Sequence, residues 1–595
     1  MTGAACVGVA CASVPGMKRG DPSVVELGTA SRSSDDGAAS ALPSGTRALM
    51  GMLADVQSEH FEQLSDASLD VPAYYLGYDM VDARARWIAA RSGALIEDAD
   101  ERTRLVDVDV RVGSRALDNG NPTAKYERNG LGAGATFPLD PAPLALRQRL
   151  WEVTDAQYSA ALEAFAQVSS EAQLQGLVEA SPSDFGPPRS RETHAWRPLL
   201  DVSEEWARWR PRARALSELL EDDPKVRAAT VRLQLLEGTH HMLDTDGGRS
   251  VHVKTRVRLS LEVSAQADDG MLVERFASFD GQSLDALPDE ETARAAALAL
   301  RGEVVALREA SLAEPFTGPA ILDGRAAAVF FHEVFGHRLE GHRQRSRAEG
   351  QTFAQKLGEP VLPAFLNVVD DPTARRLNGA PLAGHYAVDD EGVPSQAVVL
   401  VQDGILRNFL RSRAPIVEGD RSNGHGRRAP GYQAVARQGN LIISANTTVS
   451  EETLRDALIK LARRQGKPYG LWFKEIVGGY TTTERSGAQA FEVLPVLVFR
   501  VYVDGRQDEL VRGVDIVGTP LSALETILAA GDQMEVFNGV CGAESGWVPV
   551  SASSPALLLQ QLEIERSDRA IERAPLLSPP TDEDAGAAPR NEGAP

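Results

Sequence analysis

The sequence predicts an α+β protein with helices and largely antiparallel sheets in both halves of the chain. Short stretches of alternating apolar and polar residues, typical of half-buried strands, occur on both sides of a Pro- and Gly-containing segment at 314–319. Between these stretches lie blocks whose apolar residues recur at helical spacing. The composition, with 43% hydrophobic and 25% charged residues, is typical of a folded chain and excludes global disorder.

We divide the 595 residues into four segments. Residues 1–45 are rich in Ala, Ser, Gly and Asp without periodicity, which predicts a disordered leader. Residues 46–314 and 315–572 are expected to form an N-terminal and a C-terminal domain, separated at the segment 314–319. Residues 573–595 are again biased in composition and are expected to be a disordered tail.

Within the two domains, periodicity predicts particular elements. Helices are expected at 46–65, 141–179, 288–311, 450–465 and 521–531, and strands at 74–81, 105–112, 229–238 and 251–266. The last two strands flank an Asp-Gly-Gly turn signal and are predicted to form a long antiparallel hairpin. Residues 183–225 give no clear signal.

Composition also limits the partners. A net charge of −22 argues against nucleic acid or an anionic membrane, since both repel a negative surface. Three cysteines in 595 residues exclude a disulfide scaffold. No uncharged apolar run approaches the roughly 20 residues that a membrane helix requires, and the N-terminus is a poor secretory signal, so we expect a cytoplasmic protein.

The segment GRAAAVFFHEVFGHRLEGHRQ is the most informative part of the chain. It places His332, Glu333 and His337 on an apolar helix, and two imidazoles with a carboxylate are what a catalytic zinc site needs. The two histidines are five residues apart, which on an ideal helix separates them by about 140°. We therefore predict a π-bulge, permitted by Gly336, that lets both reach one ion. The alternative is a set of side chains that hydrogen-bond within a buried helix.

A zinc site usually takes three protein ligands, so two histidines leave it incomplete. Cys541, in NGVCGAESGWVPV, is the candidate third ligand, with flanking glycines that let the backbone bend close to an ion. The alternative for an isolated cysteine is a small buried thiol.

Several separate stretches resemble the TldD/PmbA family of metallopeptidases. HEVFGHRLEGH is similar to its HExxxH signature, DDEGVPSQ (389–396) to its D-D-E-G-x-P-[ST] segment, and SNGHGRR (422–428) to its S-N-G-x-G-R stretch. YGLWFKEIVGGYT (469–481) and the GVCG and VPV stretches resemble its Gly-Gly strand and its C-terminal cysteine motif. The similarity covers roughly residues 315–560 in sequence and 46–310 only in pattern.

The resemblance implies an N-terminal α/β domain and a C-terminal, largely antiparallel β domain that carries the metal-site helix. It implies one Zn²⁺ per chain, with His332, His337 and Cys541 as ligands and Glu333 as the catalytic base. It further implies unfolded peptide substrates and a dimer, either a homodimer or a heterodimer with a PmbA-like subunit.

The chain departs from the family pattern around the cysteine, where Ala543, Ser545 and Gly546 replace Lys, Gly and Gln. The P-R-M-[ST]-N stretch keeps Arg437 and Asn440 but has Ala436 and Gln438 in place of Pro and Met, and His342 replaces an acidic residue. Arg437 and Asn440 are retained as candidate site residues.

Three further residues have two interpretations each. Glu340 could orient a ligand histidine or pair with Arg343 or Arg347 on a helix surface. His342 is expected to be exposed, the alternative being an adventitious ligand. His425 could donate a hydrogen bond to an oxyanion, although a loop histidine is more often at the surface.

A turn and a strand in the same half also have two interpretations each. Asp389 and Asp390 are expected to be structural residues of a turn. The strand around 491–503 could bind a peptide by strand addition, but a core strand is the expected role.

The sequence thus favours a zinc-dependent peptidase that acts on unfolded peptides, with Glu333 as general base. The alternatives are a catalytically inactive regulatory subunit of the same fold and a zinc hydrolase of non-peptide amides. Retention of all four site residues argues against the inactive subunit.

Overall fold

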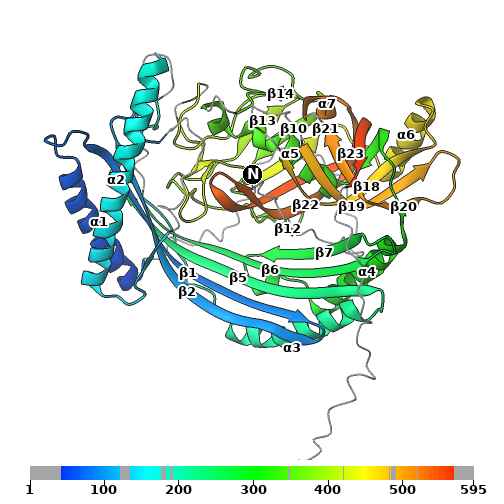
Figure 1. Ribbon diagram of the computed structural model, residues 1–595, viewed down its shortest axis with the longest axis horizontal. Coiled ribbons are helices and arrows are strands. Elements are labelled where there is room, and N and C mark those ends of the chain that lie inside the picture. Colours follow the sequence, from blue (N-terminus) through cyan, green and yellow to red (C-terminus); the bar gives the residue numbers. More distant parts are fainter. Residues whose placement is uncertain are drawn as a thin grey trace, which may run out of the picture.

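The computed structural model describes residues 42–567, except 121–133, 176–182, 188–191, 346–348, 418, 420, 482, 484–490 and 519. The predicted leader and tail lie outside the described residues, apart from the last residues of the leader, where helix α1 already begins at Ser44. Two large sheets and the helices packed on them make up the fold, which confirms the α+β class (Figure 1).

The N-terminal half builds a seven-stranded sheet in the order β3-β2-β1-β5-β6-β4, with β7 also paired to β6. Its strands are β1 (Ala73–Arg91), β2 (Ala94–Val112), β3 (Ala135–Phe137), β4 (Glu192–Ala195), β5 (Val226–Asp244), β6 (Arg249–Gln266) and β7 (Leu272–Gly281). The predicted hairpin at 229–266 is confirmed, because β5 and β6 pair antiparallel on either side of the Asp-Gly-Gly turn. All pairs in this sheet are antiparallel except β4 with β6.

Four helices accompany this sheet: α1 (Ser44–Leu64), α2 (Pro143–Gln175), α3 (Ser203–Glu221) and α4 (Glu290–Glu309). Figure 1 shows α3 and α4 on the convex side of the sheet and α1 with α2 at one end. Helix α3 was missed in the sequence, although Trp206, Trp209, Ala213 and Leu216 follow a helical period toward the core, because Pro211 interrupts it. None of the helices in the described part of the chain is long and apolar enough to span a membrane.

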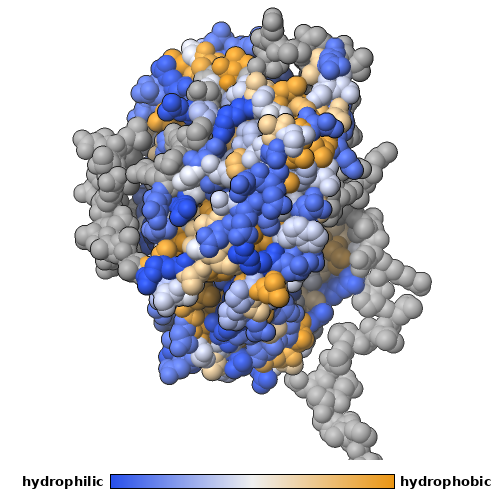
Figure 2. Space-filling view, turned by 90° about the vertical axis from the view of Figure 1, so that its left-hand side faces the viewer, coloured by the Kyte–Doolittle hydropathy of each residue, from blue (hydrophilic) through white to orange (hydrophobic). Residues whose placement is uncertain are grey.

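Figure 2 views the end of the molecule where α1 and α2 lie. Apolar residues form separate patches there among hydrophilic ones, and Leu144 and Trp151 of α2 are more than half exposed. Scattered apolar residues of this kind are normal on a protein surface.

The C-terminal half builds a twelve-stranded sheet in the order β14-β13-β10-β17-β23-β9-β18-β19-β20-β8, with β21 paired to β19 and β23, and β22 paired to β23. Its strands are β8 (Ser311–Leu312), β9 (Phe316–Leu322), β10 (Leu366–Asp370), β13 (Val398–Gln402), β14 (Ile405–Leu406), β17 (Asn440–Ala445), β18 (Tyr469–Thr481), β19 (Phe491–Tyr502), β20 (Glu509–Arg512), β21 (Val514–Gly518), β22 (Ile527–Ala543) and β23 (Gly546–Arg566). Short pairs are formed by β11 (Arg376–Leu377) with β12 (Ala380–Pro381) and by β15 (Gly426–Arg427) with β16 (Val435–Ala436). The helices are α5 (Gly324–Val334), α6 (Glu451–Arg464) and α7 (Pro520–Glu525).

The segments 491–503 and 521–531 both form strands in the structure, the second from Ile527 onward. The helix predicted at 521–531 is wrong beyond Glu525, because the chain from Ile527 onward pairs with β23 and buries Ile527 and Ala530 as a strand. The strand at 491–503 is β19, which pairs with β18 on one side and with β20 and β21 on the other. Its expected role as a core strand is therefore confirmed.

Buried charges join the two sheets. Arg428 next to β15 contacts Asp79 of β1 at 3.0 Å, and Lys254 of β6 pairs with Asp390. Arg275 of β7 lies between Glu303 of α4 and Glu475 of β18, at 2.7 and 3.2 Å. The division into domains at 314–319 stays a prediction, and β8 already joins the second sheet at Ser311.

Candidate metal centre

Helix α5 carries the first two site residues, and all its residues except Arg325 are buried. It follows β9 directly through Asp323 and packs on β18, β22 and β23. Its small residues, Ala326 to Ala328, allow a close approach to the sheet, and all are fully buried. Strand β9, central in the sheet, therefore fixes where His332 and Glu333 lie.

The helix ends at Val334, between His332 and His337, and a 3₁₀ turn from Gly336 to Leu339 follows. The predicted π-bulge is therefore wrong. The backbone leaves helical geometry at Phe335, with φ −116° and ψ −52°, and this break rather than a widened helix rotates His337 toward His332. Gly336 is required for a different reason than expected, because a Cβ there would lie 2.0 Å from Oε1 of Gln438.

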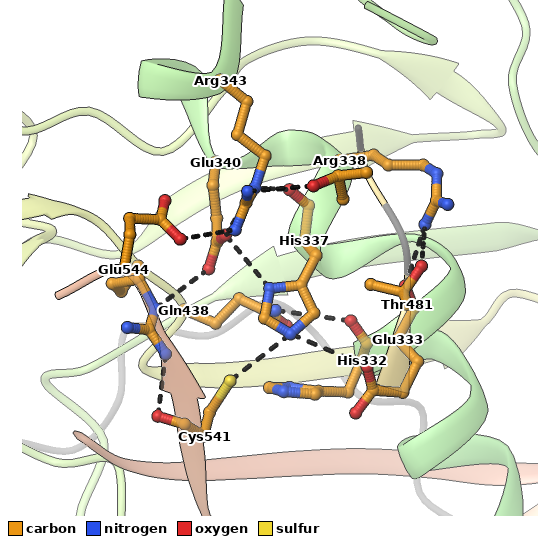
Figure 3. A network of polar contacts seen from close by, with 12 residues as sticks. His332, Glu333, His337, Arg338, Glu340, Arg343, Gln438, Thr481, Cys541 and Glu544 are labelled. Atoms are coloured by element: carbon orange, nitrogen blue, oxygen red, sulfur yellow. Dashed lines mark hydrogen bonds and ion pairs between the residues drawn. The ribbon is translucent and has the colours of Figure 1, made fainter. Parts of the chain in front are cut away.

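Cys541 comes from the β22–β23 hairpin, where it lies opposite Val548. The hairpin places its Sγ 3.4 Å from Nε2 of His337. One ligand atom from each of His332, His337 and Cys541 lies within 4.8 Å of the others, and all three residues are buried. The structure thus brings together the three predicted ligands, which are separated by up to 209 residues in the chain (Figure 3).

Glu333 lies beside this cluster, with Oε2 3.8 Å from Nε2 of His337. Burial raises the pKa of Glu333, and the neighbouring His332 and His337 oppose this rise. A carboxylate in this position can accept a proton from a water next to the cluster.

Glu340 is fully buried, so the alternative of a pair on a helix surface is wrong, and it contacts both His337 and Arg343 inside the protein. Its Oε2 lies 3.1 Å from Nδ1 of His337 and accepts a hydrogen bond from Nη2 of Arg343 at 2.8 Å. Burial alone would raise its pKa, but His337 and Arg343 lower the pKa of Glu340 to about 2. An ionised Glu340 orients the ring of His337 so that Nε2 faces Cys541.

Arg437, fully buried, joins Glu340 to the cysteine strand. Its Nε lies 3.4 Å from Oε1 of Glu340, and its Nη2 donates to the carbonyl of Cys541 at 2.8 Å. Its Nη1 donates to Oγ of Ser545 at 2.8 Å. Of the two residues retained from the P-R-M-[ST]-N stretch, Arg437 therefore reaches the cluster.

The other candidates lie elsewhere or differ from expectation. Asn440 donates to the carbonyls of Asp371 and Ala374 and supports a loop. His425 is completely buried, with Nε2 3.2 Å from Asp370, so the expectation of a surface residue is wrong and the ring is held as part of the core. His342 is also wrongly expected to be exposed, because it pairs with Glu544 and its side chain is 10% exposed.

The turn at Asp389 and Asp390 is structural, as predicted. Asp389 accepts hydrogen bonds from the backbone N–H groups of Glu391, Val393 and Gly426, and Asp390 pairs with Lys254.

Three residues near the cluster were not singled out as site residues in the sequence. Arg338 donates to the carbonyls of Glu333 and Val334, both at 3.0 Å, and so caps α5. Gln438 packs against Gly336, and Glu544 pairs with His342 and Arg343. The sequence marks position 438 only as a departure from the family pattern, and the one signal that it offers for Glu544 is the place of this residue three positions after Cys541.

The donor set fits a zinc ion. Two ligands of one tetrahedral zinc at bond lengths of about 2.0–2.3 Å lie about 3.5 Å apart, close to the 3.4 Å between His337 Nε2 and Cys541 Sγ. Within the described part of the chain, Nδ1 of His332 is buried without a hydrogen-bond partner. A thiolate with two imidazoles prefers zinc over magnesium or calcium, which take oxygen ligands.

The family model of the PmbA/TldA metallopeptidase C-terminal domain matches residues 316–566. The chain is 28% identical over 250 residues to a metalloprotease TldD homolog from Haemophilus influenzae, covering 41% of this chain and 48% of that protein. It is 26% identical over 334 residues to a metalloprotease from Methanothermobacter thermautotrophicus, covering 55% and 67%. It is 24% identical over 249 residues to a zinc metalloprotease TldD homolog from Saccharolobus solfataricus, covering 41% and 51%.

The chain spans about half the length of the first curated relatives it matches. Among solved structures, the fold is similar to a proposed modulator of DNA gyrase from Thermotoga maritima, with a TM-score of 0.57, 16% identity and coverage of 87% of this chain and 100% of that one. It is also similar to TldE from Thermococcus kodakarensis, with a TM-score of 0.55, 14% identity and coverage of 86% and 100%. Residues 316–566 thus match the C-terminal domain of the PmbA/TldA metallopeptidases, and the chain as a whole shares the fold of these solved structures.

Proposed function

We propose that the chain is a zinc-dependent peptidase that hydrolyses unfolded peptides or small proteins, with His332, His337 and Cys541 as the ligands of one zinc ion and Glu333 as the general base. The observation that carries this proposal is the convergence of these four buried side chains from α5, the following 3₁₀ turn and β22. The names of the curated relatives, which include metalloprotease and zinc metalloprotease, support it.

Each residue has a chemical task in this proposal. Zinc, when bound, polarises a peptide carbonyl and acidifies a water molecule. Glu333 takes a proton from the attacking water at Oε2 and passes it to the nitrogen of the leaving amine. Glu340 holds His337 in orientation through Nδ1, so that Nε2 faces the cluster.

The burial of the site supports a flexible substrate. His332, Glu333, His337 and Cys541 are each at most 7% exposed, so a folded domain cannot reach them. A single extended chain is the substrate form with the smallest cross-section. The proposal therefore favours unfolded peptides over folded proteins.

Oligomeric state is a further part of the proposal. The family resemblance supports a dimer, either of two copies or with a PmbA-like subunit. Light scattering of the purified chain, alone and mixed with such a subunit, measures this directly, and a monomer under both conditions contradicts it.

Peptide cleavage tests the proposed function. The wild type is expected to cleave a denatured protein, whereas Glu333→Ala keeps its zinc and loses cleavage by about 10²–10⁴-fold, because the proton acceptor is gone. Glu451→Ala, at an exposed site on α6, is the matched control and should cleave like the wild type.

The other outcomes separate the alternatives. A zinc-loaded wild type that cleaves no peptide, but hydrolyses other amides, favours the non-peptide hydrolase. A chain without any hydrolytic activity favours the regulatory subunit.

A further inference from the structure

The three ligands of the candidate metal centre come from two parts of the chain that must be held together. His332 and His337 belong to α5 and the turn after it, whereas Cys541 belongs to the β22–β23 hairpin. The geometry of a three-ligand site depends on how firmly these two parts are joined near the ligands. Residues that connect the two parts can therefore affect metal binding without being ligands.

Glu544, near the end of the hairpin, makes two such contacts. Its carboxylate pairs with Nε2 of His342 and lies 3.4 Å from Nη2 of Arg343. Both partners lie on the 3₁₀ turn Gly341–Arg345, which follows the turn that carries His337. Glu544, three residues after Cys541, thus connects the hairpin that carries the cysteine to the segment that carries His337.

Arg343 continues the connection to the ligand itself. Its Nη2 donates to Glu340 at 2.8 Å and its Nε donates to the carbonyl of His337 at 3.0 Å. Glu340 in turn contacts Nδ1 of His337 at 3.1 Å. A chain of ion pairs and hydrogen bonds therefore runs from Glu544 through Arg343 and Glu340 to the ring of His337 (Figure 3).

Negative and positive side chains alternate from Glu544 through Arg343 to Glu340, so each of these neighbouring pairs attracts. Burial alone would raise the pKa of Glu544, but Arg343 and His342 hold it well below its usual value. The side chains of Glu340, Arg343 and His342 are at most 10% exposed and that of Glu544 is 23% exposed, so solvent and salt screen these pairs less than pairs at the open surface.

We propose that Glu544 is a positioning residue, which fixes the cysteine hairpin against the histidine segment and thereby raises the affinity for zinc. This inference rests on the proposed zinc site. It assigns to Glu544 no contact with the metal or the substrate. Loss of an outer hydrogen-bonding partner of a metal ligand typically lowers metal affinity by about 10–100-fold.

The chain offers a matched control for this proposal. Glu349 also pairs with Arg343, at 3.5 Å from its Nη1, and its side chain is 20% exposed, close to the 23% of Glu544. Replacement of Glu349 by Gln removes the same charge from the same guanidinium but leaves the hairpin connected. It therefore separates the loss of a negative charge from the loss of the connection.

The experiment measures the zinc dissociation constant of the full chain by competition with a chelator for the wild type, Glu544→Gln and Glu349→Gln. We expect zinc to bind about 10–100-fold more weakly to Glu544→Gln, and within about twofold of the wild type to Glu349→Gln. At saturating zinc, peptide cleavage by Glu544→Gln should return to near the wild-type rate, as expected for a residue that only positions.

Several results would overturn the proposal. One is wild-type affinity in Glu544→Gln, another is an equal loss in Glu349→Gln, and a third is cleavage that stays low at saturating zinc. If Glu544→Gln does not fold, His342→Ala, which loses one of the two contacts, should bind zinc more weakly, and unchanged affinity there contradicts the proposal. A wild type that binds no zinc instead overturns the proposed zinc site itself, so the two failures are distinguishable.

Discussion

Gly336 lies between the two histidines of the candidate metal centre, and its lack of a side chain allows the 3₁₀ turn to lie close to Gln438. A Cβ at this position would lie only 2.0 Å from Oε1 of Gln438, so the amide of Gln438 would have to shift to accommodate it. The distance between His332 and His337 depends on the same turn. Gly336 thus affects the geometry of the site only through the packing of this turn.

Replacement of Gly336 by Ala should therefore destabilise the protein by about 1–3 kcal/mol, the usual cost of overpacking, and weaken zinc binding. Denaturant unfolding and chelator competition measure the two effects. Gly302→Ala, in the exposed part of α4 with no atom within 4 Å, should be neutral or up to about 1 kcal/mol more stable. If the further replacement Gln438→Ala does not restore zinc binding to Gly336→Ala, the steric explanation is wrong.

At this scale the sequence predicts the reactive residues better than their surroundings. His332, Glu333, His337 and Cys541 have side chains suited to metal chemistry. The first three could be found from their type and spacing, and Cys541 from its flanking glycines and the family resemblance. The orientations of His425 and His342 could not be predicted. His425 contacts Asp370, which is 55 residues away in the chain, and His342 contacts Glu544, which is 202 residues away. Distant contacts of this kind follow from strand register rather than from local pattern.

Helix α5 is the element on which the candidate site depends, because it is enclosed by the sheet and carries both His332 and Glu333. Its sequence predicts a buried helix correctly but not its end. The break after Val334 is stabilised by Arg338, which donates to the last carbonyls of the helix, and by the fit of Gly336 against Gln438. Both stabilising contacts depend on tertiary structure, and spacing alone therefore suggested a π-bulge.

The close packing of α5 gives a prediction for the element as a whole. Ala327 is completely buried, so Ala327→Leu should push the helix from its strands and lower the free energy of unfolding by about 1–3 kcal/mol. Zinc affinity should fall in parallel, because His332 moves with the helix. The control is Ala295→Leu on the exposed side of α4, which should change neither quantity. Unchanged zinc affinity in Ala327→Leu shows that the helix does not set the site.

The two sheets of the whole molecule are joined by buried charges, and this makes the joint sensitive to acid. Asp390 lies opposite Lys254 and Arg428, with His240 nearby. Burial alone would raise its pKa, but Lys254, His240 and Arg428 lower the pKa of Asp390 to about 2. A carboxyl whose pKa is lower in the folded than in the unfolded chain stabilises the fold above its unfolded pKa, near 4.

This stabilisation should be fully present at pH 6 and should be lost as the pH falls from about 4 toward 2. The lowered pKa corresponds to about 2 kcal/mol, so Asp390→Asn should be less stable than the wild type by that order at pH 6. The difference should shrink below pH 4, as followed by denaturant unfolding at each pH. Asp268→Asn, at a side chain that is 91% exposed, is the control. A difference that stays constant down to pH 3 contradicts the assigned electrostatic role.

The topology of the whole molecule could be predicted only in part. Alternation revealed the β5–β6 hairpin because both strands are adjacent in sequence and each has one buried face. The pairing of β9 with both β18 and β23 could not be predicted, because these strands are more than 140 residues away. This pairing is what brings Cys541 to the histidines, so the sequence indicated the ligands but not how they meet.

Metal content is the measurement that tests the central claim most directly. The wild-type chain, prepared without a metal-binding tag, should contain about one zinc per chain by mass spectrometry, as expected for a three-ligand site with one open position. A chain that retains no zinc, after zinc is supplied and the excess removed, would contradict the account, because His332, His337 and Cys541 would then converge without binding the ion that they fit.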